Sequence, residues 1–241
     1  TLSVAITLAL GSATAVANAA QTSAKDTAKD VEKISVLGSR VSSRTATEST
    51  APVDIIDASS LTKGGFTELG QSLQATEPSF NFSRTQVSDG SDLFRPATLR
   101  GLQPDQTLVL VNGKRRHNQA IFGLNGTVGA GAAGTDMNAI PLTALSDVQV
   151  LRDGAAAQYG SDAIAGVINL SLKSSTGETT GFIQAGSTSE GDGDDITIGL
   201  NRGFDLGDDG GFINLSLEAR DYSGTNRAQP DTGGSSTIAK G

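Results

Sequence analysis

Few residues in this chain are able to do covalent or metal chemistry. It contains no Cys and a single His, His117. A thiolate nucleophile, a Cys-based zinc or iron–sulfur site and a multi-histidine metal site are therefore excluded. A Ser-His-Asp hydrolase built on His117 would need its nucleophile on a sharp turn, and no Gly-x-Ser-x-Gly elbow is present. We predict no catalytic residue, no metal site and no cofactor.

One glycine-rich stretch resembles a cofactor-binding loop. Gly129–Gly134 reads Gly-Ala-Gly-Ala-Ala-Gly, which matches the dinucleotide fingerprint Gly-x-Gly-x-x-Gly. That fingerprint requires a strand before it and a helix after it. Gly123 and Gly126 interrupt the preceding segment, and Pro141 follows too soon for a crossover helix. We interpret the stretch as a low-complexity loop and keep a soluble dinucleotide-binding oxidoreductase as an alternative.

Basic residues near this loop offer a second kind of chemistry. Lys114-Arg-Arg-His117 follows the turn signal Asn112-Gly113 and opens a long loop over residues 114–139. Such a patch binds an anion, or it is a solvated turn or a set of ion pairs. Arginine donors suit a ligand that carries carboxylates or catecholates. The predicted ligand contacts lie in segments 84–95 and 114–139 and are Arg84, Arg95, Arg115, Arg116 and His117.

The charge distribution argues against nucleic acid as a partner. The chain has a formal net charge of −8, and residues 178–241 hold 11 acidic and 4 basic residues, a balance of −7. A protein that binds a phosphate backbone needs clustered positive charge instead.

The first residues have the pattern of an export signal. Residues 1–10 are mostly apolar and uncharged, and Ala17-Asn-Ala19 is a small-x-small cleavage site. The apolar run is too short for a membrane-spanning helix. We expect residues 1–19 to be a signal peptide that has lost its start, because the chain begins at Thr1.

A short β-prone island stands between two polar runs. Residues 31–41 read Val-Glu-Lys-Ile-Ser-Val-Leu-Gly-Ser-Arg-Val, and residues 20–30 and 42–51 on either side are small, polar and charged. An isolated strand of this kind either pairs with a distant part of its own domain or adds to the sheet edge of a partner protein.

Residues 45–177 predict a mixed domain of short elements. Pro78 ends an amphipathic helix in which Phe66, Leu69 and Leu73 are spaced i, i+3, i+7. The expected strands are 53–57, 98–101, 107–111, 148–152 and 167–173, the expected helices are 58–64 and 66–75, and a helical turn is expected at 141–145.

The pattern changes after Gly177. Residues 181–187, 195–201 and 211–219 alternate apolar and polar side chains, and acidic turns separate them. Alternation over about ten residues is typical of transmembrane β-strands, but a soluble antiparallel sheet has the same period. A secreted β-rich binding module therefore stays open as a further alternative.

Three segments resemble the TonB-dependent outer-membrane receptor family. The most specific is residues 147–173, with landmarks Val148-Gln-Val-Leu-Arg152, Tyr159-Gly160 and Gly166-Val-Ile-Asn169. Before it come Leu99-Arg-Gly101 and Leu108-Val-Leu-Val-Asn-Gly113, and earlier still a segment similar to the TonB box. Many members have Arg-Gly-Pro where this chain has Arg152-Asp-Gly154, and Gly-Gly in place of Ala165-Gly166. These departures indicate a subgroup and make transfer of a ligand from the family unsafe.

The resemblance implies an organisation and a function. It implies a flexible segment, 20–44, carrying the box; an α+β plug domain, 45–177; and the first antiparallel strands of a transmembrane β-barrel, 178–241, incomplete against the family's 22 strands. The implied function is ligand-gated import of a scarce nutrient such as a ferric siderophore across the outer membrane, without enzymatic activity. The implied partners are TonB, a small extracellular ligand and outer-membrane lipid. The residues implied to bind TonB are Glu32, Lys33, Ile34, Ser35, Val36, Leu37 and Gly38.

Overall fold

The computed structural model describes residue 37 and residues 53–82, 94–123, 129–152, 155–207 and 210–224. These residues all belong to one compact unit, Ile34–Gly241. The expected signal peptide and residues 31–36 and 38–41 of the β-prone island lie outside the described residues. The described part consists of a mixed domain, residues 53–173, and a three-stranded sheet, residues 179–222.

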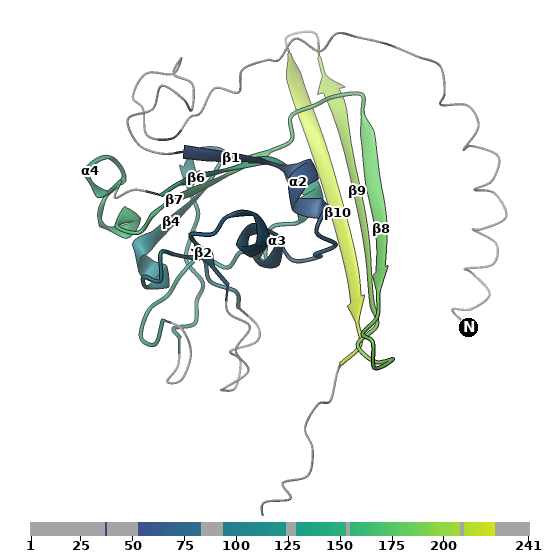
Figure 1. The fold of residues 1–241 in the computed structure, drawn as a ribbon. Helices are drawn as coiled ribbons and strands as arrows, with labels where there is room; N and C mark the ends of the chain where they lie inside the picture. Colours follow the sequence, from purple (N-terminus) through teal and green to yellow (C-terminus); the bar gives the residue numbers. More distant parts are fainter. Residues whose placement is uncertain are drawn as a thin grey trace, which may run out of the picture. The chain divides into compact units, whose positions relative to one another are not determined.

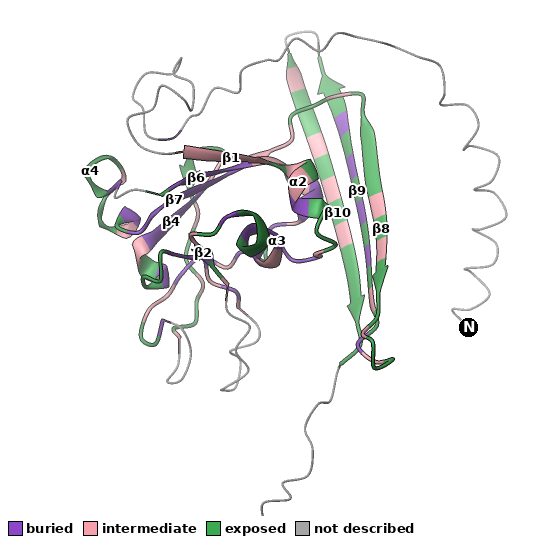
Figure 2. Cartoon of the chain, viewed as in Figure 1, coloured by how far each residue is buried: buried purple, intermediate pink, exposed green. Residues whose placement is uncertain are grey.

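A five-stranded sheet organises the mixed domain (Figure 1). Its strand order is β1 (Val53–Asp57), β6 (Leu145–Leu151), β7 (Gly166–Leu172), β4 (Thr107–Val111) and β5 (Lys114–Arg115). β4 and β7 pair in parallel, and the other neighbours are antiparallel. The central strands β4, β6 and β7 are largely buried (Figure 2). Their near-continuous Val, Ile and Leu runs fit strands that are covered on both faces.

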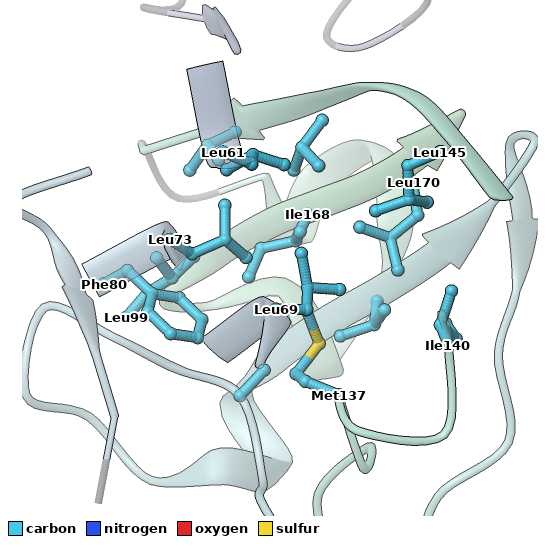
Figure 3. Packing of buried hydrophobic residues seen from close by; sticks show 14 of the residues in the cluster. Leu61, Leu69, Leu73, Phe80, Leu99, Met137, Ile140, Leu145, Ile168 and Leu170 are labelled. Carbon is cyan, nitrogen blue, oxygen red and sulfur yellow. The ribbon is translucent and has the colours of Figure 1, made fainter. Parts of the chain in front are cut away.

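One face of this sheet carries the main hydrophobic core. Helices α2 (Ala58–Thr62) and α3 (Leu69–Thr76) and the small hairpin of β2 (Phe80–Asn81) and β3 (Thr98–Leu99) contribute to it. Figure 3 shows Leu61, Leu69, Leu73, Phe80 and Leu99 gathered with Ile168, Leu170 and Met137. The opposite face carries a smaller cluster, which we call the Leu37 cluster. Its buried members are Leu37, Leu108, Leu110, Leu151, Ala155, Ala163 and Val167.

Three predicted elements are shorter than expected, and the first is the helix predicted over 58–64, which ends at Thr62. The helix predicted from residue 66 begins at Leu69, because Glu68 is extended, with φ −103° and ψ 133°. The strand predicted over 98–101 ends at Leu99, because Arg100 and Gly101 have positive φ values of 58° and 72°. A strand cannot continue through two left-handed residues.

The Asn112-Gly113 turn is confirmed. Both residues have positive φ, 49° and 74°, and they join β4 to β5 as a two-residue hairpin loop. The Asn112 Oδ1 atom accepts a hydrogen bond from the Leu172 amide at 2.8 Å. The Asn169 Oδ1 atom accepts one from the Gly113 amide, also at 2.8 Å. These two side chains fasten the hairpin to β7.

Short helical segments join the strands. The expected helical turn at 141–145 is the 3₁₀ turn η4 (Leu142–Ala144), and η3 (Pro104–Gln106) precedes β4. The segment between β6 and β7, for which the sequence predicted no element, contains α4 (Ala156–Tyr159) and η5 (Ser161–Ala163). Within the described ranges, no helix is long and apolar enough to cross a membrane.

The three alternating segments form the second sheet. It has the order β10 (Gly211–Tyr222), β9 (Asp195–Leu206), β8 (Thr179–Gly186), with antiparallel pairing throughout. The predicted alternation is confirmed, and the strands are longer than the sequence indicated. Along β9, exposed and buried residues alternate from Ile196 to Phe204 (Figure 2).

The register gives the second sheet two different faces. One face, the outer face, carries aliphatic side chains that are about half exposed or more, including Ile183, Ile198, Leu200, Leu215 and Leu217. The other face, the inner face, carries small and polar residues together with Phe182, Phe212 and Tyr222. On β9 these are Asp195, Thr197, Gly199, Asn201 and Gly203.

Candidate functional site

Three of the predicted ligand contacts lie together. Arg115, Arg116 and His117 line a hollow of about 270 Å³, whose other lining residues include Asp105 and Asp162. Arg115 forms an ion pair with Asp162 and donates a hydrogen bond from Nη2 to the Tyr159 carbonyl oxygen at 2.7 Å. The hollow therefore offers positively charged hydrogen-bond donors and negatively charged acceptors. Arg115 is already bonded to Asp162 and to the Tyr159 carbonyl oxygen.

The other two predicted contacts are placed differently. Arg95 is only 7% exposed, and its guanidinium donates to the Phe94 carbonyl oxygen at 3.1 Å. Its backbone amide donates to the Asp136 carboxylate at 3.2 Å. Arg95 thus ties the segment before β3 to residue 136. Arg84 lies outside the described residues.

The box segment is represented by one described residue, Leu37. Its side chain is 1% exposed and packs in the Leu37 cluster, with Leu108 and Leu110 of β4 and Val167 of β7. Val53, the first residue of β1, lies at the edge of the same cluster. The segment predicted to bind a partner is therefore anchored to the mixed domain at this position.

Arg100 and Arg152, which belong to two of the family-like segments, meet beside β1, at one edge of the five-stranded sheet. Arg152 forms an ion pair with Asp54 of β1, with 2.6 Å between Nε and Oδ2. Arg100 donates to the Arg152 carbonyl oxygen at 3.2 Å. Burial raises the pKa of the Asp54 carboxyl; Arg152 opposes this rise and the neighbouring Glu77 adds to it. The edge strand β1 is thus held by a polar contact as well as by its pairing with β6.

The glycine-rich loop does not form a dinucleotide site. Gly129 and Gly131 have φ values of 78° and 81°, and Ala130 forms an isolated bridge with Gly123. The next helical element in the described chain is the three-residue turn η4. The helix that the fingerprint requires is missing from residues 129–141, so this loop gives the oxidoreductase alternative no support. The part of the chain that the structure describes holds no cluster of His, Asp or Glu suited to a metal ion.

The inner face of the second sheet meets the mixed domain closely. A Cβ atom added at Gly199 would overlap Thr143, and one at Gly203 would overlap the Ser175 carbonyl oxygen. Beneath this contact Thr197 is 0% exposed and Asn201 is 2% exposed. The glycines allow a closer approach than any other residue type would.

Charged residues reinforce this contact. Arg220 of β10 lies 3.2 Å from Glu68, between Nη1 and Oε1, and 3.1 Å from Asp195, between Nε and Oδ1. The Thr67 hydroxyl donates to Asp195 Oδ2 at 3.2 Å. Sequence reasoning missed this set, and it also missed Asp162 as the partner of Arg115. Glu68 and Arg220 are 152 positions apart, and no spacing rule connects them.

Comparison with known proteins identifies what this chain is similar to. The family model "TonB-dependent Receptor Plug Domain" matches residues 45–167. A probable TonB-dependent siderophore receptor, PirA of Acinetobacter baumannii, is 31% identical over 157 residues, 64% of this chain and 20% of the relative. The ferric enterobactin receptor of Pseudomonas aeruginosa is 31% identical over 175 residues, 68% of this chain and 23% of the relative. A vitamin B12 transporter, BtuB of Photobacterium profundum, is 32% identical over 137 residues, 56% of this chain and 20% of the relative.

Solved structures agree at the level of the fold. A double mutant of the ferric enterobactin receptor from Pseudomonas aeruginosa has a TM-score of 0.52 and 25% identity, over 71% of this chain and 24% of that one. The siderophore receptor PirA from Acinetobacter baumannii has a TM-score of 0.51 and 24% identity, over 73% and 25%. The chain spans about a quarter or less of the length of these relatives.

Proposed function

The chain belongs to the TonB-dependent receptor plug family, and on this premise we propose that it is the plug, with the first barrel strands, of an outer-membrane import receptor. The receptor imports a scarce nutrient such as a ferric siderophore, is gated by its ligand and is energised through TonB. In this proposal residues 1–19 are the signal peptide, 20–44 the flexible segment, 45–177 the plug domain and 178–241 the first strands. Import of this kind needs no covalent chemistry, and the named relatives are receptors and transporters.

The observation that carries the proposal is the junction between plug and sheet. β8 follows β7 after only six residues, and its sheet turns mainly small and polar residues, with Phe182, toward the plug and aliphatic residues outward. β9 and β10 have 12 residues each, and a tilted strand of about 9–11 residues crosses a bilayer. Exposed Ile and Leu side chains on one face are costly in water and favourable in lipid.

The box segment supplies the contact with TonB. We assign this role to Glu32, Lys33, Ile34, Ser35, Val36, Leu37 and Gly38, which would add as a strand to an edge of the partner's sheet. The burial of Leu37 supports a docked state at rest, from which the segment must be released. Force on the released segment would act next on β1, which has only β6 as a strand partner in the described sheet.

An Ile34→Pro substitution tests this assignment. Proline removes a backbone donor and fixes φ, so it breaks a two-stranded ladder at that position. A peptide of residues 30–42 with this change should bind the purified TonB C-terminal domain at least about tenfold more weakly, as for the loss of one or two hydrogen bonds. The matched control is Thr27→Pro in a longer peptide, because residue 27 lies before the box. Equal binding by both peptides would refute the assignment.

Arg115, Arg116 and His117 are the proposed ligand contacts in the described plug, with Arg84 in the segment not described. Arg95 fits this role less well, because it is buried and bonded to its own loop. The hollow beside Asp105 and Asp162 supports recognition of a polar ligand with both donors and acceptors.

A double substitution, Arg115→Ala with Arg116→Ala, separates ligand contact from a structural role. Ferric enterobactin and cobalamin are the probes, because relatives are named for them. If these arginines contact ligand, affinity of the full-length receptor should fall by about tenfold or more, from charge-assisted bonds of roughly 1.5–3 kcal/mol each. The control is Lys114→Ala, an exposed neighbour in β5. Unchanged affinity with a lower Tm of the plug would show that Arg115 serves only its bonds to Asp162 and Tyr159.

A further inference from the structure

One cation lies on the apolar outer face of the second sheet. Every second residue of β9 faces outward, and these residues are Ile196, Ile198, Leu200, Arg202, Phe204 and Leu206. Arg202 is exposed, and its guanidinium carbon lies 5.1 Å from the centre of the Phe204 ring. A guanidinium over an aromatic face is attracted by the ring. Phe204 therefore holds the charged group of Arg202 toward the Leu206 end of the strand.

The side chains around Arg202 are apolar, apart from one hydroxyl group. Thr179 of β8 and Leu215 of β10 lie directly opposite it in the register. Leu200 and Phe204 flank it along β9. β9 is the central strand of the three, so the residues on both sides of Arg202 are described and do not depend on how the wall continues.

The charge of Arg202 has no acidic partner on this face. Among the described strands, the outer face carries one acidic residue, Asp221 of β10, which is paired with Ile196. Ile196 lies six residues before Arg202, about 20 Å along a strand that rises about 3.4 Å per residue. A cation on a lipid-facing strand is costly at the bilayer midplane and costs little near the interface. An unpaired arginine on this face is therefore favourable only where it reaches the headgroups.

Loop lengths indicate which end of β9 faces the periplasm. Four residues join β9 to β10, and eight join β8 to β9. Outer-membrane barrels have short periplasmic turns and longer extracellular loops, so the Leu206 end is periplasmic.

The length of β9 gives the depth of the guanidinium. From Ile196 to Leu206 the outer face spans about 26 Å at a strand tilt of about 40°, which matches an apolar band of about 25 Å. On the same scale Phe204 lies about 5 Å from the periplasmic boundary of that band. The Arg202 guanidinium, which lies over this ring, is thus close to the phosphates of the inner leaflet.

We propose that Arg202 binds the phosphate of an anionic phospholipid in the inner leaflet of the outer membrane. The inference rests on the proposed function, because it needs β9 to cross that membrane. The guanidinium presents paired donors that fit two phosphate oxygens, and Phe204 fixes their level in the bilayer. A cation with no acidic neighbour favours a lipid of net negative charge over a zwitterionic one.

Native mass spectrometry of the full-length receptor in detergent, titrated with phosphatidylglycerol, measures this binding. Arg202→Met keeps a long side chain without the charge and should weaken binding of the first lipid by about tenfold or more, as for the loss of one or two charge-assisted hydrogen bonds. Arg202→Lys keeps the charge without the paired donors and should have an intermediate affinity. The matched control is Lys114→Met, which removes an exposed cation from the plug and leaves the outer face unchanged.

A second measurement avoids detergent. The full-length receptor is folded into phosphatidylcholine vesicles with and without phosphatidylglycerol, and the Tm of the barrel is read from its heat-dependent mobility in gel electrophoresis. Phosphatidylglycerol should raise the Tm of the parent and of Lys114→Met, because a ligand that binds only the folded state stabilises it. It should raise the Tm of Arg202→Met less.

The proposal is overturned if Arg202→Met binds phosphatidylglycerol as tightly as the parent, or if Lys114→Met loses as much affinity. Equal affinity for zwitterionic phosphatidylethanolamine would also contradict it. So would displacement of the lipid by inorganic phosphate, or by lipopolysaccharide, which belongs to the outer leaflet. Failure of the proposed function would look different: the full-length protein would be missing from the outer-membrane fraction, or would show no heat-dependent mobility at all.

Discussion

Replacing Gly166 with Ala should destabilise the plug by about 2–4 kcal/mol, from backbone strain and overpacking combined. Gly166 begins β7 with φ at 145°, a conformation that side-chain-bearing L residues rarely adopt. An added Cβ would also overlap the Leu151 carbonyl oxygen of β6 and press on the Leu99 side chain at 3.0 Å. Neither neighbour can give way easily, because Leu151 and Leu99 are both buried.

Urea unfolding of the plug, monitored by hydrogen exchange at the β6 and β7 amides, measures this loss of stability. Gly65→Ala is the matched control: its φ is 71°, but nothing lies within 4 Å of an added Cβ. The control should therefore lower the free energy of unfolding only through backbone strain, by about 1 kcal/mol. Equal losses in the two variants would contradict the close approach of β6 to Gly166.

Replacing Gly203 with Ala should loosen the plug in the barrel. The new Cβ would overlap the carbonyl oxygen of Ser175, which is backbone and cannot rotate away. Either β9 or the chain that joins plug to barrel must shift, and the neighbouring Asn201 network, including its 2.7 Å bond to Ser216, shifts with it. Small displacements in a well-packed contact are costly, about 1–3 kcal/mol for one inserted methyl group.

Sensitivity of cells to vancomycin, which is too large to cross an intact outer membrane, reports a loosened plug. Cells expressing the full-length Gly203→Ala receptor should become several-fold more sensitive than cells expressing the parent at equal abundance. Gly186→Ala is the control, because it stands on the same inner face with open space around it. If Gly186→Ala has the same effect, or Gly203→Ala has none, the plug does not pack on β9 as described.

The parts of the fold that follow from local chemistry were predictable. Asn112-Gly113 requires two positive φ values and specified the hairpin, and the apolar runs at 107–111 and 167–173 specified buried strands. The alternation after Gly177 specified β8–β10, because a sheet with one apolar face has a period of two.

Where prediction failed, tertiary contacts had overruled the local pattern. Phe66 has helical spacing with Leu69 and Leu73, yet Thr67 and Glu68 stay outside the helix and bond to Asp195 and Arg220 on the wall. The helix can begin only after those two residues. The bonds join residues more than 120 positions apart in the sequence, so no local rule could have predicted them.

The candidate ligand site was predictable only as a set of residue types. The sequence grouped five basic side chains by loop and charge, but burial separates Arg95 from the others and Asp162 neutralises Arg115. Asp162 follows the landmark Tyr159-Gly160, in a segment for which the sequence predicted no helix or strand. Its helical turns depend on the packing of Ala155 and Ala163 beneath the sheet. Alanines give no hydrophobic pattern in the sequence from which that packing could be predicted.

The central claim is that residues 45–172 close a barrel whose wall begins at β8. Planar-bilayer conductance of the purified full-length receptor, compared with the same receptor lacking residues 45–172, tests it most directly. The parent should give no steady conductance, and the deletion variant should give a large, stable one, because a barrel wide enough to hold a domain leaves a water-filled lumen. A deletion variant that inserts in the membrane but stays closed, or a parent that conducts equally well, would contradict the account.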